Sequence, residues 1–278
     1  MESRNLPLLG EDPLTELGQR QIESALGQAT FWRKVVYLPT VGSTNDAAKD
    51  LAARGAPEGT VVVADEQTAG RGRLGRCWLA PPSTCLLCSL LFRPALSLAQ
   101  ANRLTMLSSL AAADAVNEVA GLRVSLKWPN DLIVPPTWKK LSGVLTETGM
   151  VGAQLDFVVV GVGVNVNVPP EALPDLDPNA TSILAETGRV VDRLALLTAF
   201  LAEVERRYET LRTGANPRQE WAGRLATLGR LVKATTSDGV FTGVAESVDE
   251  DGALLLRASD GALRRLLAGD VTLARSAD

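Results

Sequence analysis

The stretch that decides the fold is LSGVLTETGMVGAQLDFVVVGVGV, which spans residues 141–164. Its two ends, Leu141–Glu147 and Phe157–Val164, are rich in Val and Leu and have the length of buried β-strands. The residues between them, around Thr148–Gln154, are too few for the crossover that parallel strands need. The two strands therefore form an antiparallel pair, and this pair indicates a mixed, largely antiparallel sheet.

Strands and helices alternate along the rest of this region. The clearest helix is Ala101–Val119, because Leu104 and Leu107 continue one apolar stripe and Gly121 ends it. The pattern predicts the α+β class, with a mixed, largely antiparallel central sheet and flanking helices. Further strands are expected at Val35–Leu38, Val61–Ala64, Cys85–Phe92, Leu122–Lys127 and Ile133–Val134, and further helices at Leu14–Leu26, Thr44–Arg54 and Asp192–Leu211.

Short strands separated by Asp-Gly pairs follow Trp221. The pairs lie at residues 238–239, 251–252 and 260–261, and Asp-Gly between alternating strands is the strongest local signal for a β-hairpin. We therefore expect a small β-barrel after a main domain, and we divide the chain into an N-terminal extension (1–30), a main domain (31–227) and a C-terminal domain (228–278). The strands expected in the barrel are Leu231–Ala234, Val240–Ser247, Ala253–Arg257 and Leu263–Leu267.

The composition excludes several kinds of protein. The chain has no His, which removes Ser–His–Asp triads and the commonest metal ligand. Its net charge of −4 argues against a DNA-binding surface. Cys85 and Cys88 would face opposite sides of one strand, so we interpret them as core residues rather than metal ligands. The sequence has neither a secretory signal nor an apolar run of membrane-spanning length, so we expect a cytoplasmic protein.

A loop rich in Gly and Arg, AGRGRLGR at residues 69–76, follows the strand Val61–Ala64. Gly70, Gly72 and Gly75 match a dinucleotide-binding pattern, but the following residues, CWLAPP, do not start a helix in the register that this pattern requires. Glycines allow such a loop to move, and guanidinium groups bind phosphate and carboxylate with two hydrogen bonds. We expect a loop that orders over an anionic ligand; the alternative is a solvated basic loop.

Four further segments place polar side chains at strand ends or at a helix start. Lys140 begins a strand, and we expect its ammonium group to point into a site. Free amides and hydroxyls at a helix start suit small polar or anionic groups, and buried Asn side chains need partners that a ligand can supply. Each segment also has an ordinary interpretation, as a turn, a strand-edge lysine or a helix N-cap. The segments are GSTND (42–46), KWPND (127–131), KKLSGVL (139–145) and GVGVNVN (161–167).

Together these segments closely resemble the catalytic core of biotin protein ligases. The resemblance extends over residues 35–270 and depends on five motifs in one order, which is far more specific than any single motif. It implies a class II synthetase-like core and an SH3-like C-terminal barrel. The motifs are GSTN (42–45), QTAGRGR (67–73), KWPND (127–131), KLSG (140–143) and GVGVN (161–165).

The resemblance implies an ATP-dependent ligase that works in two steps. The carboxylate of biotin attacks the α-phosphate of ATP, with Mg²⁺, and gives biotinyl-5′-AMP and pyrophosphate. The acceptor lysine of a biotin carboxyl carrier protein then attacks the mixed anhydride. This agrees with the absence of His, because a carboxylate is already charged and adenylation needs cations around crowded anions rather than a base on the nucleophile.

The resemblance also implies roles for individual residues, with the metal ligands left open. Lys140 and Arg73 would be catalytic, placed at the carboxylate of biotin and the α-phosphate, and Trp78 would lie against adenine. The residues implied to bind biotin are Ser43, Thr44, Asn45, Gln67, Arg71, Gly72, Arg73 and Lys140. Those implied to bind ATP are Arg73, Arg76, Trp78, Lys127, Asn130 and Asn165.

The expected partner is the acceptor domain of acetyl-CoA carboxylase or a related carboxylase. Relatives that also act as repressors carry a winged helix-turn-helix at the N-terminus, and residues 1–30 are too few for one, so we expect no nucleic acid and no membrane as partners. Relatives form homodimers through the central sheet, so homodimerisation is a further hypothesis for this chain. Two alternatives stay open: a lipoate–protein ligase, and a biotin-binding regulator that transfers nothing.

Overall fold

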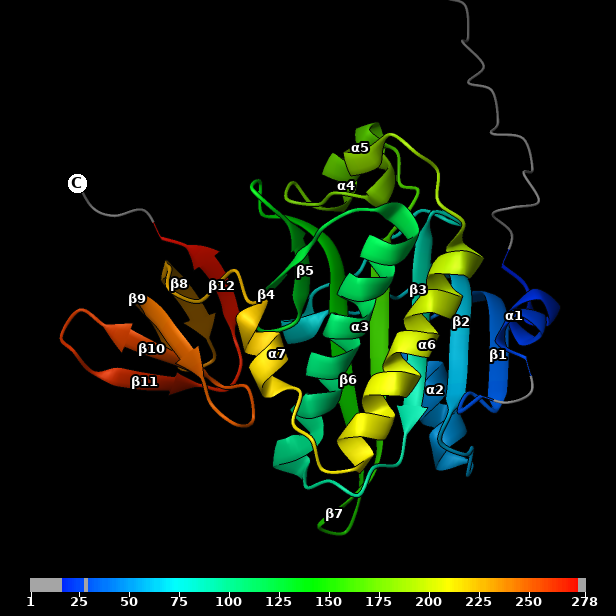
Figure 1. The fold of residues 1–278 in the computed structure, drawn as a ribbon, viewed down its shortest axis with the longest axis horizontal. Helices are drawn as coiled ribbons and strands as arrows, with labels where there is room; N and C mark the ends of the chain where they lie inside the picture. Colours follow the sequence, from blue (N-terminus) through cyan, green and yellow to red (C-terminus); the bar gives the residue numbers. More distant parts are fainter. Residues whose placement is uncertain (1–16, 28–29, 275–278) are drawn as a thin grey trace, which may run out of the picture.

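A computed structural model describes residues 17–27 and 30–274. These residues form a seven-stranded sheet of order β1-β2-β3-β7-β6-β5-β4 and a five-stranded sheet of order β11-β10-β9-β8-β12 (Figure 1). In the larger sheet β1 (Lys34–Val41) and β2 (Thr60–Gln67) run parallel, and all the other neighbouring strands run antiparallel. The predicted α+β class, with a mixed and largely antiparallel sheet, is confirmed.

The predicted antiparallel pair is β6 (Lys139–Val151) and β7 (Gln154–Asn165), and it lies inside the larger sheet. Both strands are longer than expected, because their pairing continues past the apolar run to an exposed tip at Val151. The sheet is completed by β3 (Cys85–Phe92), β4 (Ser125–Lys127) and β5 (Asp131–Val134).

Helices cover both faces of the larger sheet. The long helices α3 (Asn102–Ala120) and α6 (Arg193–Arg212) lie side by side over one face, where the main hydrophobic core is buried (Figure 1). On the other face α2 (Thr44–Ala53) packs Ala48 and Ala52 against alternate strand residues. Burial on both faces explains why these strands are continuously apolar rather than alternating.

The N-terminal helix α1 (Gln19–Leu26) packs beside the edge strand β1. Its Gln19 side chain donates from Nε2 to the Val35 carbonyl, at 2.8 Å, and accepts from the Tyr37 amide, at 2.9 Å. A neighbouring parallel strand would bind the same two backbone groups, so one amide side chain caps this part of the sheet edge. The first residues of the predicted helix Leu14–Leu26, up to residue 16, lie outside the described residues.

The C-terminal sheet contains the four predicted strands and a fifth that was not predicted. The predicted strands are β8 (Leu231–Thr236), β9 (Gly239–Val248), β10 (Leu254–Ala258) and β11 (Leu263–Leu266). The fifth, β12 (Asp270–Leu273), pairs with β8 and begins beside the larger sheet.

Short helices connect the remaining parts, and they were not predicted because each is too short to show a clear period. They are α4 (Leu173–Leu176), α5 (Ile183–Thr187) and α7 (Arg218–Gly223), with 3₁₀ turns at Arg73–Gly75, Leu98–Ala101 and Pro170–Ala172. The buried Trp128 joins the two sheets, since its Nε1 donates to the Gly252 carbonyl at 2.9 Å. Within the described part of the chain, no helix is long and apolar enough to cross a membrane.

Candidate active site

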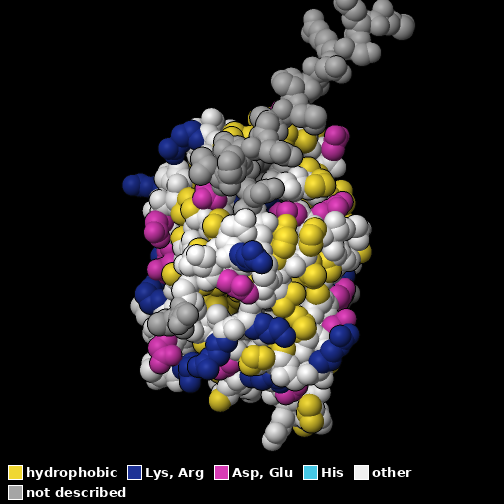
Figure 2. Space-filling model, turned by 90° about the vertical axis from the view of Figure 1, so that its right-hand side faces the viewer, with side chains coloured by type: hydrophobic (Ala, Val, Ile, Leu, Met, Phe, Trp, Pro, Cys, Tyr) yellow, Lys and Arg dark blue, Asp and Glu magenta, His cyan; other side chains and the backbone are white. Residues whose placement is uncertain are grey.

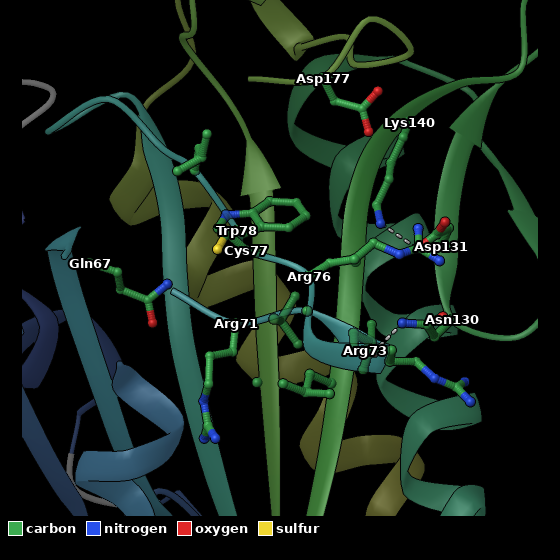
Figure 3. Close-up of a pocket in the computed structure, with 18 of the residues that line it drawn as sticks. Gln67, Arg71, Arg73, Arg76, Cys77, Trp78, Asn130, Asp131, Lys140 and Asp177 are labelled. Atoms are coloured by element: carbon green, nitrogen blue, oxygen red, sulfur yellow. Dashed lines mark hydrogen bonds and ion pairs between the residues drawn. The ribbon is translucent and has the colours of Figure 1, made fainter. Parts of the chain in front are cut away.

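One pocket over β6 and β7 brings together nearly all the residues predicted to form a site (Figure 3). Lys127 is the exception; it lies just beyond the lining residues. The pocket is closed on one side by the loop of residues 69–78. The predicted residues that line it are Ser43, Thr44, Asn45, Gln67, Arg71, Gly72, Arg73, Arg76, Trp78, Asn130, Lys140 and Asn165.

The floor of the pocket consists of glycines on the central strand pair. Gly143 on β6 lies opposite Gly163 on β7, and Gly161 lies two residues before Gly163 on the same face. A Cβ atom on Gly163 would stand 2.6 Å from the ring of Trp78, and one on Gly161 would stand 2.1 Å from Asn45 Oδ1. The glycines therefore let these two side chains lie directly on the backbone of the sheet.

Buried polar groups form one end of the pocket, at the start of α2. Gln67 Oε1 accepts from the backbone N–H of Thr44 at 2.8 Å and from its hydroxyl at 3.0 Å. Ser89 Oγ lies 2.8 Å from Thr44 Oγ1 and 2.6 Å from Asn45 Oδ1. Ser43 is also buried here. Thr44 and Asn45 of the motif GSTN and Gln67 of the motif QTAGRGR thus belong to one hydrogen-bonded unit.

Glu147 holds this polar end to the arginine loop, and sequence reasoning missed it. Its carboxylate accepts from Asn45 Nδ2 at 2.8 Å, pairs with Lys49 Nζ at 2.8 Å, and pairs with Arg71 Nη2 at 3.0 Å. Burial by itself would raise the pKa of Glu147, but these hydrogen bonds and charges hold it below its ordinary value. Arg71 also binds Asp46 Oδ1 at 2.6 Å. Arg71 therefore anchors the loop to α2 and β6.

Cationic side chains gather at the other end of the pocket. Arg73 and Arg76 extend toward the side that carries Asp131, whereas Arg71 points the opposite way (Figure 3). Lys140 Nζ lies 2.7 Å from Asp131 Oδ1 and 5.6 Å from the centre of the Trp78 ring. Burial lowers the pKa of Arg73, and the positive charge of Arg76 lowers it further. The negative charges of Asp131 and Asp270 act in the opposite direction. This end has the character of an anion-binding site.

The C-terminal sheet supplies a carboxylate to the same end, and no local sequence pattern predicts it. Asp270, the first residue of β12, lines the pocket. Its carboxylate lies 3.2 Å from Arg76 Nη2 and 3.7 Å from Lys127 Nζ. Asp270 therefore ties the arginine loop and the predicted residue Lys127 to the smaller sheet.

The two predicted asparagines use their amide nitrogens within the protein. Asn130 Nδ2 donates to the Val144 carbonyl at 2.7 Å, and Asn165 Nδ2 donates to the Thr181 carbonyl at 2.9 Å. Thr181 also donates its backbone N–H to the Lys140 carbonyl at 2.8 Å. Both asparagines therefore fix the backbone around Lys140, and their contacts to a ligand stay a prediction.

The arginine loop is folded as a tight hairpin. Gly72 donates its N–H to the Arg76 carbonyl at 2.7 Å, and a Cβ atom on Gly70 would stand 2.4 Å from the Trp78 carbonyl. No helix of the dinucleotide-binding kind begins at Gly75, as expected. Cys85 and Cys88 are free and buried in the core, as predicted. No cluster of three or more metal-ligating side chains occurs among residues 17–27 and 30–274.

The fold and the pocket define a carboxylate ligase of the biotin and lipoate type. Residues 37–165 match the biotin/lipoate A/B protein ligase family, and residues 227–273 match the biotin protein ligase C-terminal domain. The chain belongs to the biotin protein ligases.

Relatives and solved structures agree with this assignment. The bifunctional ligase/repressor BirA of Bacillus subtilis is 34% identical over 93% of this chain and 79% of its own length. The biotin–[acetyl-CoA-carboxylase] ligase of Paracoccus denitrificans is 36% identical over 81% of this chain and 94% of its own. The structure of the Aquifex aeolicus biotin protein ligase in complex with biotin and ATP is similar with a TM-score of 0.71 and 30% identity, covering 88% of this chain and all of that one.

Proposed function

We propose that this chain activates biotin with ATP to biotinyl-5′-AMP and transfers the biotin to a lysine of a biotin carboxyl carrier protein. The observation that carries the proposal is the two-ended pocket. Neutral hydrogen-bonding groups lie at the start of α2, and Lys140, Arg73 and Arg76 lie at the other end. Such a pocket suits a ligand with a polar uncharged ring and a carboxylate, joined to a phosphate.

We assign the ureido ring of biotin to Ser43, Thr44, Asn45 and Gln67. Ser43, Thr44 and Asn45 are buried and Gln67 is half-buried. Hydrogen bonds join Thr44 to Gln67 and, through Ser89, to Asn45, so these positions are fixed before a ligand arrives. Arg71 and Gly72 bind the same end of the ligand through the loop. Since Arg71 is already held by Glu147, its contribution is to keep the loop in place as well as to contact biotin.

The reacting groups are assigned to Lys140 and Arg73. Both the carboxylate of biotin and the α-phosphate are anions, and they repel each other until cations lie between them. Lys140 and Arg73 would provide those cations inside a half-buried pocket, where charges interact more strongly than in water. No general base is needed in this step, because the nucleophile is already charged.

The nucleotide is assigned to the side of the pocket formed by Arg76, Trp78, Lys127, Asn130 and Asn165. The Trp78 ring lies directly over Gly163 on the floor of the pocket, and we assign one of its faces to the adenine ring. Arg76 and Lys127 both pair with Asp270. A bound phosphate would replace the Asp270 carboxylate as the anion next to these two cations.

ATP is proposed to enter as its Mg²⁺ complex. The carboxylates nearest the phosphate side, Asp131 and Asp270, are paired with Lys140, Lys127 and Arg76, and the described residues contain no metal-binding cluster. These residues do not fit a resident metal site. Mg²⁺ is therefore assigned to the substrate phosphates, which commonly hold it in nucleotide-dependent enzymes.

The partners beyond the carrier protein stay predictions. The face that carries α1 and β1 shows Lys and Arg interspersed with Asp and Glu, which supports the expected lack of nucleic-acid binding on that face (Figure 2). Homodimerisation is tested by analytical ultracentrifugation. The division at residues 30 and 227 is also kept as a proposal, as is a cytoplasmic location, where ATP and the carrier protein would be supplied.

One assay tests the function. The protein is incubated with ATP, Mg²⁺, an acceptor domain, and either biotin or lipoate, and the acceptor is weighed by mass spectrometry. We expect the mass increase of one biotinyl group. An increase that matches lipoate would make the chain a lipoate–protein ligase, and adenylate formation without transfer would make it a biotin-binding regulator.

A further inference from the structure

The transfer step needs a group that removes a proton from the acceptor lysine. A lysine ammonium has an ordinary pKa of about 10.4, so roughly one amine in a thousand is neutral near pH 7.4. Even the neutral amine keeps a proton that must leave as the new C–N bond forms. The chain has no His, which is the usual acceptor of such protons. The carboxylates that line the pocket are the other side chains able to accept this proton.

Three carboxylates line the pocket, and two of them are poorly placed. Asp177 is exposed, and its Oδ1 accepts from the backbone N–H of Asn179 at 2.7 Å. Asp270 lies between Arg76 and Lys127 at the outer rim, with about a third of its side chain exposed (34%). The third, Asp131, is buried, with 10% of its side chain exposed.

Asp131 lies next to the place where the chemistry is proposed to occur. Its Oδ1 is 2.7 Å from Lys140 Nζ, and Lys140 is the cation assigned to the reacting carboxylate and phosphate (Figure 3). Its other oxygen, Oδ2, has Lys127 Nζ at 4.0 Å and no hydrogen-bond donor among the described residues. One carboxylate oxygen thus pairs with Lys140, and the other keeps a lone pair in a residue that lines the pocket.

The charge around Asp131 also helps the acceptor to lose its proton. An ammonium that enters beside Lys140, Arg73 and Arg76 meets like charges, which favour its neutral form. The proton would then pass to a nearby carboxylate, and Asp131, which pairs with Lys140 and Lys127, lines the pocket.

On this geometry, and on the proposed function, we propose that Asp131 is the general base of the transfer step. The acceptor nitrogen attacks the carbonyl carbon of biotinyl-5′-AMP, and the new C–N bond forms. The bond between that carbon and the phosphate oxygen breaks, and AMP leaves with the electron pair. The proton of the attacking nitrogen moves to Oδ2 of Asp131 and from there to water. Lys140 and Arg73 stabilise the departing phosphate.

The test separates the two steps in the variant Asp131→Asn, which keeps an oxygen for Lys140 but removes the base. Transfer is followed in a single turnover from prepared biotinyl-5′-AMP to a carrier domain, and adenylation is followed by biotin-dependent pyrophosphate exchange. We expect transfer to fall by about 10²–10⁴-fold, with a much smaller loss in adenylation. Equal losses in both steps would overturn the proposal, since Asp131 would then act by positioning Lys140 alone.

Two further measurements distinguish a base from a positioning residue. With hydroxylamine as the nucleophile, which is largely neutral near pH 7.4 and loses its proton easily, the variant should regain most of its transfer rate. With a lysine acceptor, the ratio of the variant rate to the wild-type rate should rise about tenfold per pH unit, as hydroxide replaces the carboxylate. A deficit of the same size for both nucleophiles would contradict the proposal. Asp270→Asn is the matched control, because it removes the same charge from another carboxylate of the pocket. It should lower the rates of adenylation and of transfer by similar factors. If the wild-type protein fails to modify any carrier domain, the proposed function itself is wrong.

Discussion

The substitution Gly163→Ala tests the glycine floor, because the new methyl group would enter the space that Trp78 fills. The Cβ atom would stand 2.6 Å from Trp78 Cε2 and 2.7 Å from Cζ2. Carbon atoms in contact are ordinarily about 3.5–4.0 Å apart, so the indole must move by about 1 Å. Overpacking of this kind costs about 1–3 kcal/mol.

The cost should appear in ligand binding rather than in folding. Trp78 is half-buried, and its free side faces the open pocket, so the ring relieves the clash by moving into space that a ligand would occupy. We expect the free energy of unfolding to change by less than about 1 kcal/mol. The dissociation constant of the ligand beside Trp78 should rise by about five- to 150-fold, which is the same 1–3 kcal/mol expressed as affinity.

Isothermal titration calorimetry with biotin and with a non-hydrolysable ATP analogue measures this effect, and urea unfolding measures stability. If Trp78 lies against adenine, the nucleotide should lose more affinity than biotin; the reverse order would move Trp78 to the biotin side. Unchanged affinity for both ligands would refute the claim that Trp78 packs on Gly163 inside the ligand pocket. Gly223→Ala is the matched control, since its Cβ atom meets no neighbouring atom within 4 Å.

Three more predictions follow from named contacts. Lys140→Ala and Arg73→Ala should each slow adenylate formation by about 10²–10³-fold at an unchanged urea midpoint, and wild-type rates would remove that residue from the mechanism. The pKa of Glu147 lies below its ordinary 4.5, so the stability gained from its contacts is complete above that pH and is lost as the pH falls through the lowered value. The free energies of unfolding of wild type and Glu147→Gln, measured in urea between about pH 7 and about pH 3.5, should therefore converge at the acid end. A difference that stays constant with pH would contradict this. Gln19→Ala should cost about 1 kcal/mol and speed hydrogen exchange of the Tyr37 amide, whereas Arg20→Ala should leave that exchange unchanged.

Much of the fold was predictable because its signals are local. The apolar run around Val158–Val164 and the short connection before it predict an antiparallel pair without any long-range information. Asp-Gly pairs likewise predicted the hairpins of the smaller sheet. The strand β12 (Asp270–Leu273) was missed because it pairs with β8, more than thirty residues earlier, and carries no turn signal of its own.

The candidate site was predictable in its motifs but not in its charge pairs. A helix start, a glycine-rich loop and a strand-end lysine each concentrate polar groups within a few residues, so a single sequence reveals them. Glu147 and Asp270 stand alone in their segments, and nothing in the neighbouring residues marks them. Each becomes part of the site because the fold brings it to Arg71 or Arg76.

The sequence by itself determined the inventory: the strand pair, the hairpin tail, the arginine loop, Lys140 and the absence of histidine. The tertiary structure decided how these charges are shared, with Arg71 committed to Glu147, Arg76 to Asp270 and Lys140 to Asp131. The physical reason is that ion pairs depend on distance between atoms, and residues far apart in the chain acquire that distance when the sheets pack together. Which cations remain available to a ligand is therefore a property of the folded chain.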